Sequence, residues 1–258
     1  ELSFQSVSND KYLKLYKVKT DLVQNEADTL ESFFNFTHEN EDLFLGFQTS
    51  VFETLKDGYN DKYEYILPDI VIDNNLFSNN KYGNADFRTN LKVHNYDTNK
   101  YTKFFINDID WKYKSFNFSS GLEGKILGKL KNVNYEAKNT DKYKKDTTHE
   151  LFGALGYLSE IELYKKTAKQ RNHLLTPKAL IRYAPGHMRK TDNGKLNYGN
   201  LFNLNKIDEL DVIEPGLSSS IGFEYKKNKL TNQNLIGKEK LSFSVGQVIS
   251  EKENMDIP

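Results

Sequence analysis

Hydrophobic and polar residues alternate with a period of two along much of this chain. The run 87–96 has mostly apolar odd positions and polar even positions, and comparable alternation recurs in 108–114, 122–131, 155–163, 217–226 and 241–246. Successive side chains of a strand point to opposite sheet faces, so each run predicts a strand with one apolar and one charged or small face. Strand-like runs with a weaker pattern occupy 30–38, 43–52 and 63–73. The pattern predicts an all-β, antiparallel fold of about ten strands.

The predicted strands are long, and their connections are of two kinds. Many strands have about 9–11 residues or more, the length that a tilted strand needs to cross a bilayer, whereas strands of soluble proteins usually have about 5–6. Short connections lie at 39–41 and 96–100. Long ones lie at 137–148 and at 185–211, which contains Gly186, Gly194 and Gly199. Short and long connections are typical of an up-and-down transmembrane β-barrel.

One further strand-like run, 173–184, contains Pro177. Proline cannot donate a hydrogen bond to a sheet ladder. We therefore expect a bulge, a sheet edge or a strand start at Pro177; alternatively, the strand begins after it.

Composition removes several classes of protein. The 36 basic and 36 acidic residues give a formal net charge of zero, whereas a nucleic-acid-binding protein normally has a basic excess. Cysteine is absent, which excludes disulfides and thiolate metal sites. The mean hydropathy is −0.71, and no segment approaches the roughly 20 apolar residues of a membrane-spanning helix. A membrane barrel remains compatible with these values, because its strands alternate apolar and polar residues.

Catalytic and metal-binding patterns are weak. None of the five histidines has metal-ligand spacing, and neither a phosphate-binding loop nor a nucleophile elbow occurs. Asp108 and Asp110 lie on one face of a predicted strand and could resemble a catalytic pair. Lys112 and Lys114 continue that face, which favours a solvated wall of mixed charge. We therefore expect no catalytic residues, no metal and no cofactor.

Part of the chain resembles a signature of a known family. Residues 175–189 read LTPKALIRYAPGHMR, and the resemblance continues through YGNLFNLNKI at 198–207 and through 214–225. These stretches resemble the lipopolysaccharide-assembly proteins of the LptD family, also called organic-solvent-tolerance proteins, and are closest to alphaproteobacterial members. Shorter similarities at 10–13, 65–70 and 243–247 extend the resemblance over nearly the whole chain.

The resemblance implies a very large barrel of about 26 strands in the outer membrane of a Gram-negative bacterium. A periplasmic jellyroll domain precedes such a barrel, and an LptE-like lipoprotein plugs its lumen. Lipopolysaccharide arrives from a periplasmic bridge protein and enters the outer leaflet through a lateral opening. This chain has too few strands and no recognisable jellyroll. It also lacks the cysteines that link domains in some members. We therefore expect 1–258 to be an open, curved portion of the barrel, without the N-terminal jellyroll and the remaining strands, including those of the lateral gate.

This interpretation assigns one strand face to lipid and the other to water. Backbone polar groups in the hydrocarbon layer must pair from strand to strand, because no water is present there. The lipid-facing candidates are Phe87, Leu91, Val93, Ile109, Trp111 and Tyr113. The lumen-facing candidates are Arg88, Lys92, Asp108, Asp110, Lys112, Lys125, Lys129, Glu160, Glu162 and Glu224. Their mixed charge suits contact with the plug protein or with anionic sugars and phosphates of the cargo.

Other classes of protein stay open beside this interpretation. A different outer-membrane porin or receptor barrel shares the strand pattern but not the 175–189 motif. A soluble β-sandwich that binds carbohydrate would pack its apolar strand faces against each other. An enzyme has no support, because no nucleophile, base and orienting group can be assembled. We expect a non-catalytic conduit wall whose partners are lipopolysaccharide, the plug lipoprotein, the bridge protein (through the missing N-terminal domain) and outer-membrane lipid, but no nucleic acid.

Overall fold

The computed structural model describes residues 1–20, 23, 26–56, 58, 62–167, 171–189, 195–207, 209–230 and 236–251. Gly194, part of a connection predicted from the sequence, lies outside these residues. No helix in the described ranges is long and apolar enough to cross a membrane. The elements are β1 (Leu2–Ser3), α1 (Tyr12–Tyr16), β2 (Thr29–Glu39), β3 (Leu43–Thr54), β4 (Tyr63–Asn79), β5 (Gly83–Asp97), β6 (Lys100–Lys112), β7 (Phe116–Asn117), β8 (Leu122–Lys138), β9 (Thr148–Ile161), β10 (Leu163–Thr167), β11 (Arg171–Ala184), β12 (Gly216–Leu230) and β13 (Ile236–Ser250).

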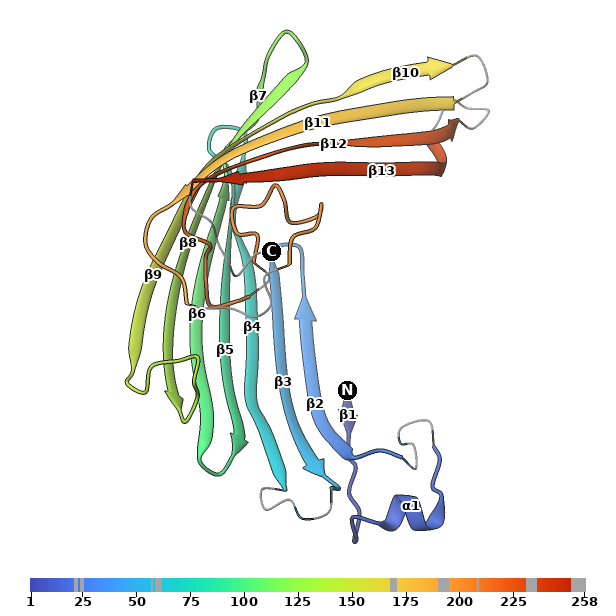
Figure 1. Ribbon diagram of the computed structural model, residues 1–258, viewed down its shortest axis with the longest axis vertical. Helices are drawn as coiled ribbons and strands as arrows, with labels where there is room; N and C mark the ends of the chain where they lie inside the picture. Colours follow the sequence, from blue (N-terminus) through green and yellow to red (C-terminus); the bar gives the residue numbers. More distant parts are fainter. Residues whose placement is uncertain are drawn as a thin grey trace. The chain divides into compact units, whose positions relative to one another are not determined.

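The thirteen strands of the described part belong to one sheet, in which the long strands follow their sequence order (Figure 1). The order is β1-β2-β3-β4-β5-β6-β8-β9-β11-β12-β13, while β7 pairs with β8 and β10 pairs with β11. The long strands have between 11 and 17 residues, and β1, β7 and β10 have two to five. The prediction of about ten long antiparallel strands is confirmed. The order has two ends, β1 and β13, so the sheet is open over the described residues.

The chain divides into two compact units. Unit 1 comprises residues 1–75, 87–108 and 132–150, and unit 2 comprises residues 76–86, 109–131 and 151–258. The strands β4, β5, β6, β8 and β9 therefore contribute residues to both units.

In unit 1, a small apolar cluster forms beside α1. Leu13 of the helix is buried with Leu30 and Leu55, and neighbouring valines and an alanine pack against them. The helix ends at Tyr16, and Lys17 adopts a left-handed conformation with φ of 52°. No helical periodicity marks this five-residue segment in the sequence. The all-β prediction is confirmed, with this one short helix in the described residues. Helices this short depend on tertiary burial, which Leu13 supplies.

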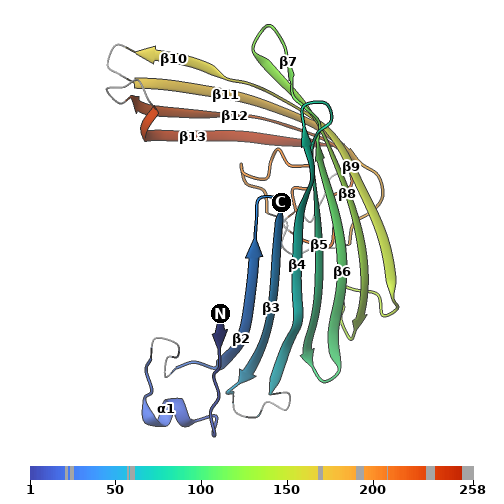
Figure 2. The ribbon, with the colours of Figure 1, turned by 180° about the vertical axis from the view of Figure 1, so that it is seen from behind.

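In unit 2, the strands β11, β12 and β13 lie side by side in both views (Figure 2). The pairing of β11 with β12 runs from Arg171 opposite Lys229 to Ala184 opposite Gly216 without a register shift. The other edge of β11 pairs with β10 and then with β9. Both pairings have the same register, so β9 and β10 are one strand interrupted at Glu162.

Pro177 lies beside this interruption. The described pairing of β11 with β10 ends at Leu175, and the pairing with β9 begins at Lys178. The missing N–H of Pro177 therefore leaves no gap in a continuous ladder on that side. Pro177 itself lies inside β11 and pairs with Phe223 of β12 without a register shift, so the expected bulge, sheet edge or strand start is not found there. The alternative that the strand begins after Pro177 is wrong, because β11 begins at Arg171.

Candidate functional site on the loop face of unit 2

The connection between β11 and β12 lies on one face of the sheet in unit 2, as far as its described residues 185–189, 195–207 and 209–215 show. Two glycines of the strands show how closely it approaches. A Cβ atom on Gly156 would lie 2.6 Å from Leu204 Cδ2, and one on Gly222 would lie 3.2 Å from Phe202 Cζ. The missing side chains thus let apolar residues of the connection reach the strand backbone. We call this covered side the loop face.

The connection has its own core and its own internal hydrogen bonds. Its buried apolar residues are Leu201, Leu204, Ile207, Val212 and Ile213. The side-chain amide of Asn200 donates to two backbone carbonyl groups, and the amide of Asn205 donates to two others. Buried backbone groups need such partners where no ladder supplies them. Residues 195–215 therefore have a defined fold of their own, apart from Asp208, which lies outside the described residues.

Three buried charged side chains join the connection to β11. Lys206 Nζ lies 2.8 Å from Glu214 Oε2 and donates to Ser218 Oγ at 3.0 Å. Arg182 Nη1 lies 3.5 Å from the same carboxylate oxygen, and Arg182 also donates to the backbone carbonyl of Glu214. All three charged side chains are at most 4% exposed. Two cations thus share one carboxylate. Burial lowers the pKa of Lys206, and the hydrogen bond to Glu214 opposes that effect.

Two further contacts hold the connection in place. Arg189 Nη2 lies 3.1 Å from Asp211 Oδ2 and donates to the Asp211 carbonyl at 2.6 Å. Lys131 of β8 is buried, and its Nζ donates to the carbonyl of Leu210 at 2.5 Å. The connection is therefore bound to both β8 and β11 by buried cations.

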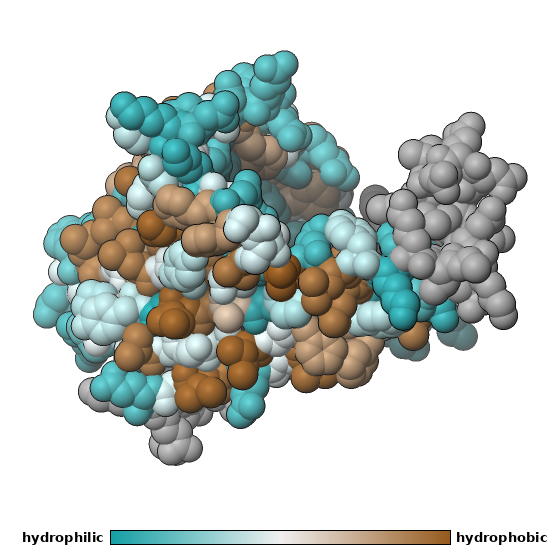
Figure 3. Space-filling model, turned by 90° about the horizontal axis from the view of Figure 1, so that it is seen from above, coloured by the Kyte–Doolittle hydropathy of each residue, from teal (hydrophilic) through white to brown (hydrophobic). Residues whose placement is uncertain are grey.

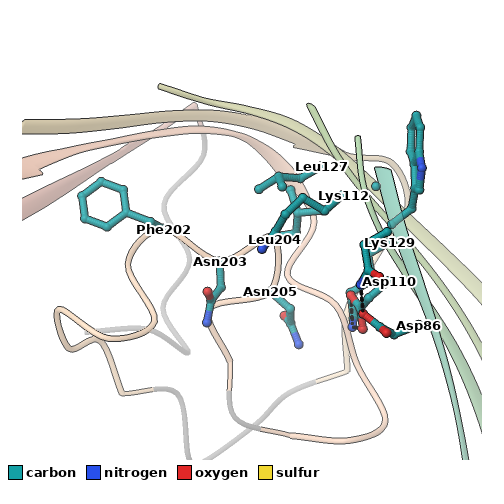
Figure 4. Close-up of a pocket in the computed structure, with 12 residues that line it drawn as sticks. Asp86, Asp110, Lys112, Leu127, Lys129, Phe202, Asn203, Leu204 and Asn205 are labelled. Carbon is teal, nitrogen blue, oxygen red and sulfur yellow. Dashed lines mark hydrogen bonds and ion pairs between the residues drawn. The ribbon is translucent and has the colours of Figure 1, made fainter. Parts of the chain in front are cut away.

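A polar depression of about 350 Å³ lies between the connection and the strands (Figure 4). The strands contribute Asp86, Asp110, Lys112 and Lys129, and the connection contributes Phe202–Asn205. Lys129 Nζ lies 2.6 Å from Asp110 Oδ2, as the dashed lines show. The lining offers ammonium and amide donors, carboxylate acceptors and an apolar edge. Such a set can bind hydroxyl and phosphate groups of a hydrated ligand.

A second ionic network crosses β8, β9 and β11. Glu160 accepts a hydrogen bond from Lys125 at 2.7 Å and lies 3.2 Å from the ammonium of Lys178. Lys125 also lies 3.2 Å from Glu123. These side chains are only 18–35% exposed. The charges on this part of unit 2 are therefore paired across neighbouring strands.

A family model described as "LptD: LPS transport system D" matches residues 1–257. The chain belongs to the LptD family. No curated protein matches it. Membership assigns the chain a role in lipopolysaccharide transport at the outer membrane, with lipopolysaccharide as the substrate. The resemblance carried by residues 175–189 is thereby confirmed at the level of the family. LptD is a family of transport components.

Half of the lumen-facing candidates of this LptD-family chain meet in two groups in unit 2. Asp110, Lys112 and Lys129 line the polar depression. Lys125 and Glu160 form the second ionic network. The sequence placed these residues on the same strand faces, and the structure adds the partners that they meet.

The other lumen-facing candidates lie apart from these groups. Asp108 is buried in unit 1. The contacts of the remaining four are Arg88 with Asp73, Lys92 with Asp69 at 3.1 Å, Glu162 with the hydroxyl of Tyr164 and Glu224 with Lys226 at 2.8 Å. Whether any of the ten candidates faces a lumen stays a prediction.

The opposite side of unit 2, which we call the open face, exposes large apolar side chains. In the register of β11 with its neighbours, these side chains alternate along each strand with those that point to the loop face. Their exposed fractions lie between 37% and 62%, and they include Leu155, Tyr157, Ile181, Tyr183, Leu217, Ile221, Phe223, Phe243 and Val245. Figure 3 shows hydrophobic side chains gathered over much of the visible surface. Large exposed apolar patches are rare on soluble monomers and mark surfaces that contact a membrane or a partner.

The lipid-facing candidates divide between the two units. Ile109 and Trp111 line an apolar hollow together with Leu155 of the open face. Tyr113 is half-buried in unit 2, and Phe87, Leu91 and Val93 are half-buried in unit 1. Their contact with lipid stays a prediction.

Sequence reasoning missed the buried cations and their carboxylate. Arg182 lies 32 residues from Glu214, and Lys206 lies 8 residues from it in a connection without regular structure. No local spacing pattern therefore marks the three residues as a group. One signal was available. Residues 201–213 contain Leu201, Leu204, Ile207, Val212 and Ile213, and so many large apolar residues are unusual for a solvated loop.

Proposed function

We propose that this chain forms part of the wall of an outer-membrane translocon that inserts lipopolysaccharide into the outer leaflet without catalysing a reaction. The observation that carries the proposal is the contrast between the two faces of unit 2. The loop face holds paired charges and a polar depression, whereas the open face exposes large apolar side chains. A conduit wall needs this contrast, because one face contacts hydrocarbon and the other contacts hydrated sugar.

In this proposal, residues 1–258 supply a portion of the barrel domain in a Gram-negative bacterium, of the alphaproteobacterial type. The open strand order supports the assignment to a portion of a larger barrel, since β1 and β13 do not pair with each other in the described part. The jellyroll domain and the remaining strands, including those of the lateral gate, lie outside these residues. An LptE-like lipoprotein contacts the lumen side, and the periplasmic bridge protein delivers cargo through the jellyroll domain.

The faces have distinct roles in transport. The ten lumen-facing candidates, from Arg88 to Glu224, contact the plug or the glycan of the cargo. The six lipid-facing candidates, from Phe87 to Tyr113, contact outer-membrane lipid. Exposed ammonium groups such as that of Lys112 attract phosphate. Neighbouring carboxylates limit the strength of binding, so that the cargo moves on.

The test is charge reversal in cells that depend on the variant protein. Lys125→Glu with Lys129→Glu breaks both the Glu160 and the Asp110 contacts. We expect less lipopolysaccharide at the cell surface and greater permeability to hydrophobic antibiotics. The matched control is Lys144→Glu with Lys145→Glu, which makes the same change of charge in the exposed connection between β8 and β9. Equal surface lipopolysaccharide in both double variants and in wild type would contradict the proposal.

A further inference from the structure

An apolar hollow interrupts the open face of unit 2. Its volume is about 470 Å³, and its lining includes Ile109, Trp111, Leu130, Leu155 and Tyr183. Leu130, Leu155 and Tyr183 are 45%, 62% and 55% exposed. Two glycines in neighbouring strands, Gly128 and Gly153, contribute no side chains to the lining and leave the hollow open between the larger residues around it.

An aromatic and basic cluster adjoins this hollow at the end of β6. The indole N–H of Trp111 donates to the carbonyl of Tyr82 at 2.9 Å, and the Trp111 and Tyr113 rings meet edge to face. Lys81 Nζ lies 4.9 Å from the Tyr82 ring centre, and Lys114 Nζ lies 6.0 Å from the Tyr113 ring centre. Aromatic residues with lysines are typical of the level where hydrocarbon gives way to headgroups.

We propose that the hollow and this cluster together form a binding site for an anionic phospholipid. One acyl chain occupies the hollow beside Gly128 and Gly153, and the headgroup phosphate lies near Lys81 and Lys114. The proposal rests on the proposed function, since it requires the open face to contact the membrane. It goes further by assigning a selective site to a surface that otherwise exchanges lipid freely.

The strand topology favours a phospholipid over lipopolysaccharide as the occupant. The cluster that would hold the headgroup lies at the turn 80–82 between β4 and β5, at the strand ends opposite the longest connection, 185–215. The hollow that would hold the acyl chain extends from Trp111 to Pro185, where that connection begins. Outer-membrane barrels have short turns on the periplasmic side and longer loops outside. The periplasmic leaflet of a membrane that holds lipopolysaccharide in its outer leaflet consists of phospholipid. The two ammonium groups complement the negative headgroup.

Trp111 is the only tryptophan of the chain, which gives the test its probe. The full-length protein is placed in phosphatidylcholine vesicles that contain a small share of phosphatidylglycerol with brominated acyl chains, which quench tryptophan on contact. The Trp111 signal is the difference between wild type and Trp111→Phe. We expect quenching well above the share of brominated lipid. Replacing Lys81 or Lys114 by Gln should lower the preference about fivefold, the effect of one basic residue at an anionic surface.

A filling variant and a matched control separate site binding from general lipid contact. A Cβ atom on Gly153 would meet only the Lys129 carbonyl, at an ordinary 3.9 Å, so Gly153→Leu fills the hollow with little strain. This variant should reduce quenching to the share of brominated lipid. Ala179→Leu adds bulk to the same face opposite Ile221, outside the hollow, and should keep the excess.

Three outcomes would overturn parts of the argument. Wild-type quenching in simple proportion to the brominated lipid would remove the selective site but keep the membrane-facing assignment. Displacement of the brominated phospholipid by an equal concentration of lipopolysaccharide would show that the site binds lipopolysaccharide rather than a phospholipid. No quenching by any brominated lipid, even as the main component, would contradict the lipid-facing role of Trp111 and with it the proposed function.

Discussion

Replacing Glu214 by Gln removes the carboxylate that Arg182 and Lys206 share. Both cations stay buried, with side chains at most 1% exposed. Removing one partner of a buried ion pair costs about 3–5 kcal/mol, because the other charge is left without compensation. Lys206→Met removes one desolvated cation and leaves Glu214 with Arg182 at 3.5 Å. This change should cost less, about 1–2 kcal/mol, mainly through the hydrogen bond to Ser218.

The two variants are compared by hydrogen exchange of the amides in 200–207 and 209–214, which reports local opening of the connection. A cost of about 3–5 kcal/mol corresponds to exchange faster by roughly two to three and a half powers of ten in Glu214→Gln. Lys206→Met should accelerate exchange by about one power of ten. The double variant should cost less than the sum of the two, because the residues are in contact. Equal exchange in both single variants would refute the shared carboxylate as the group that holds the connection.

Three further predictions concern the same unit. Burial lowers the pKa of Lys206, so between the lowered and the ordinary pKa the folded connection binds fewer protons than the opened one. The stability of the connection should therefore rise with pH in this window and fall as pH drops through the lowered pKa. Hydrogen exchange measured against pH and corrected for intrinsic rates should show this slope in wild type and lose it in Lys206→Met. A Cβ atom on Gly246 would overlap Leu201, so Gly246→Leu should displace the connection and lower the stability by about 1–3 kcal/mol. The measurement is the temperature at which the barrel unfolds and its migration on a gel shifts, which should be lower in the variant. Pro177→Ala should change the stability by less than about 1 kcal/mol and that temperature correspondingly little, since the β9–β10 side of the ladder is interrupted beside residue 177.

The sequence predicted the strands well because their signal is local. Alternation along β5, β8 and β12 reports which side chains share a face, and that depends only on the pleat. The short helix α1 escaped notice because one buried leucine stabilises it rather than a repeated pattern. The interruption between β9 and β10 was not predicted, because the proline beside it lies in β11 and the sequence does not show which strand pairs with it.

The site was predicted only in part, for a related reason. Lys125 and Glu160 could be placed on a face, but their pairing depends on strand register, which alternation does not fix. Lys131 meets Leu210 across a sequence separation of 79 residues. Such a contact follows from the arrangement of the whole sheet and from the path of the connection, and neither can be read from the neighbouring residues.

The contacts of Lys206, Leu210 and Glu214 with the strands have a consequence for the order in which the protein matures. Lys131, Arg182 and Ser218 come from β8, β11 and β12, so the receiving surface exists only after these strands have assembled. Before that moment Lys206 and Glu214 remain hydrated, and burying them early would be costly. Docking of the connection is therefore a late event. The connection therefore docks stably only on a correctly paired sheet, because a sheet with the wrong register does not offer the partners that Lys206 and Glu214 need once they lose water.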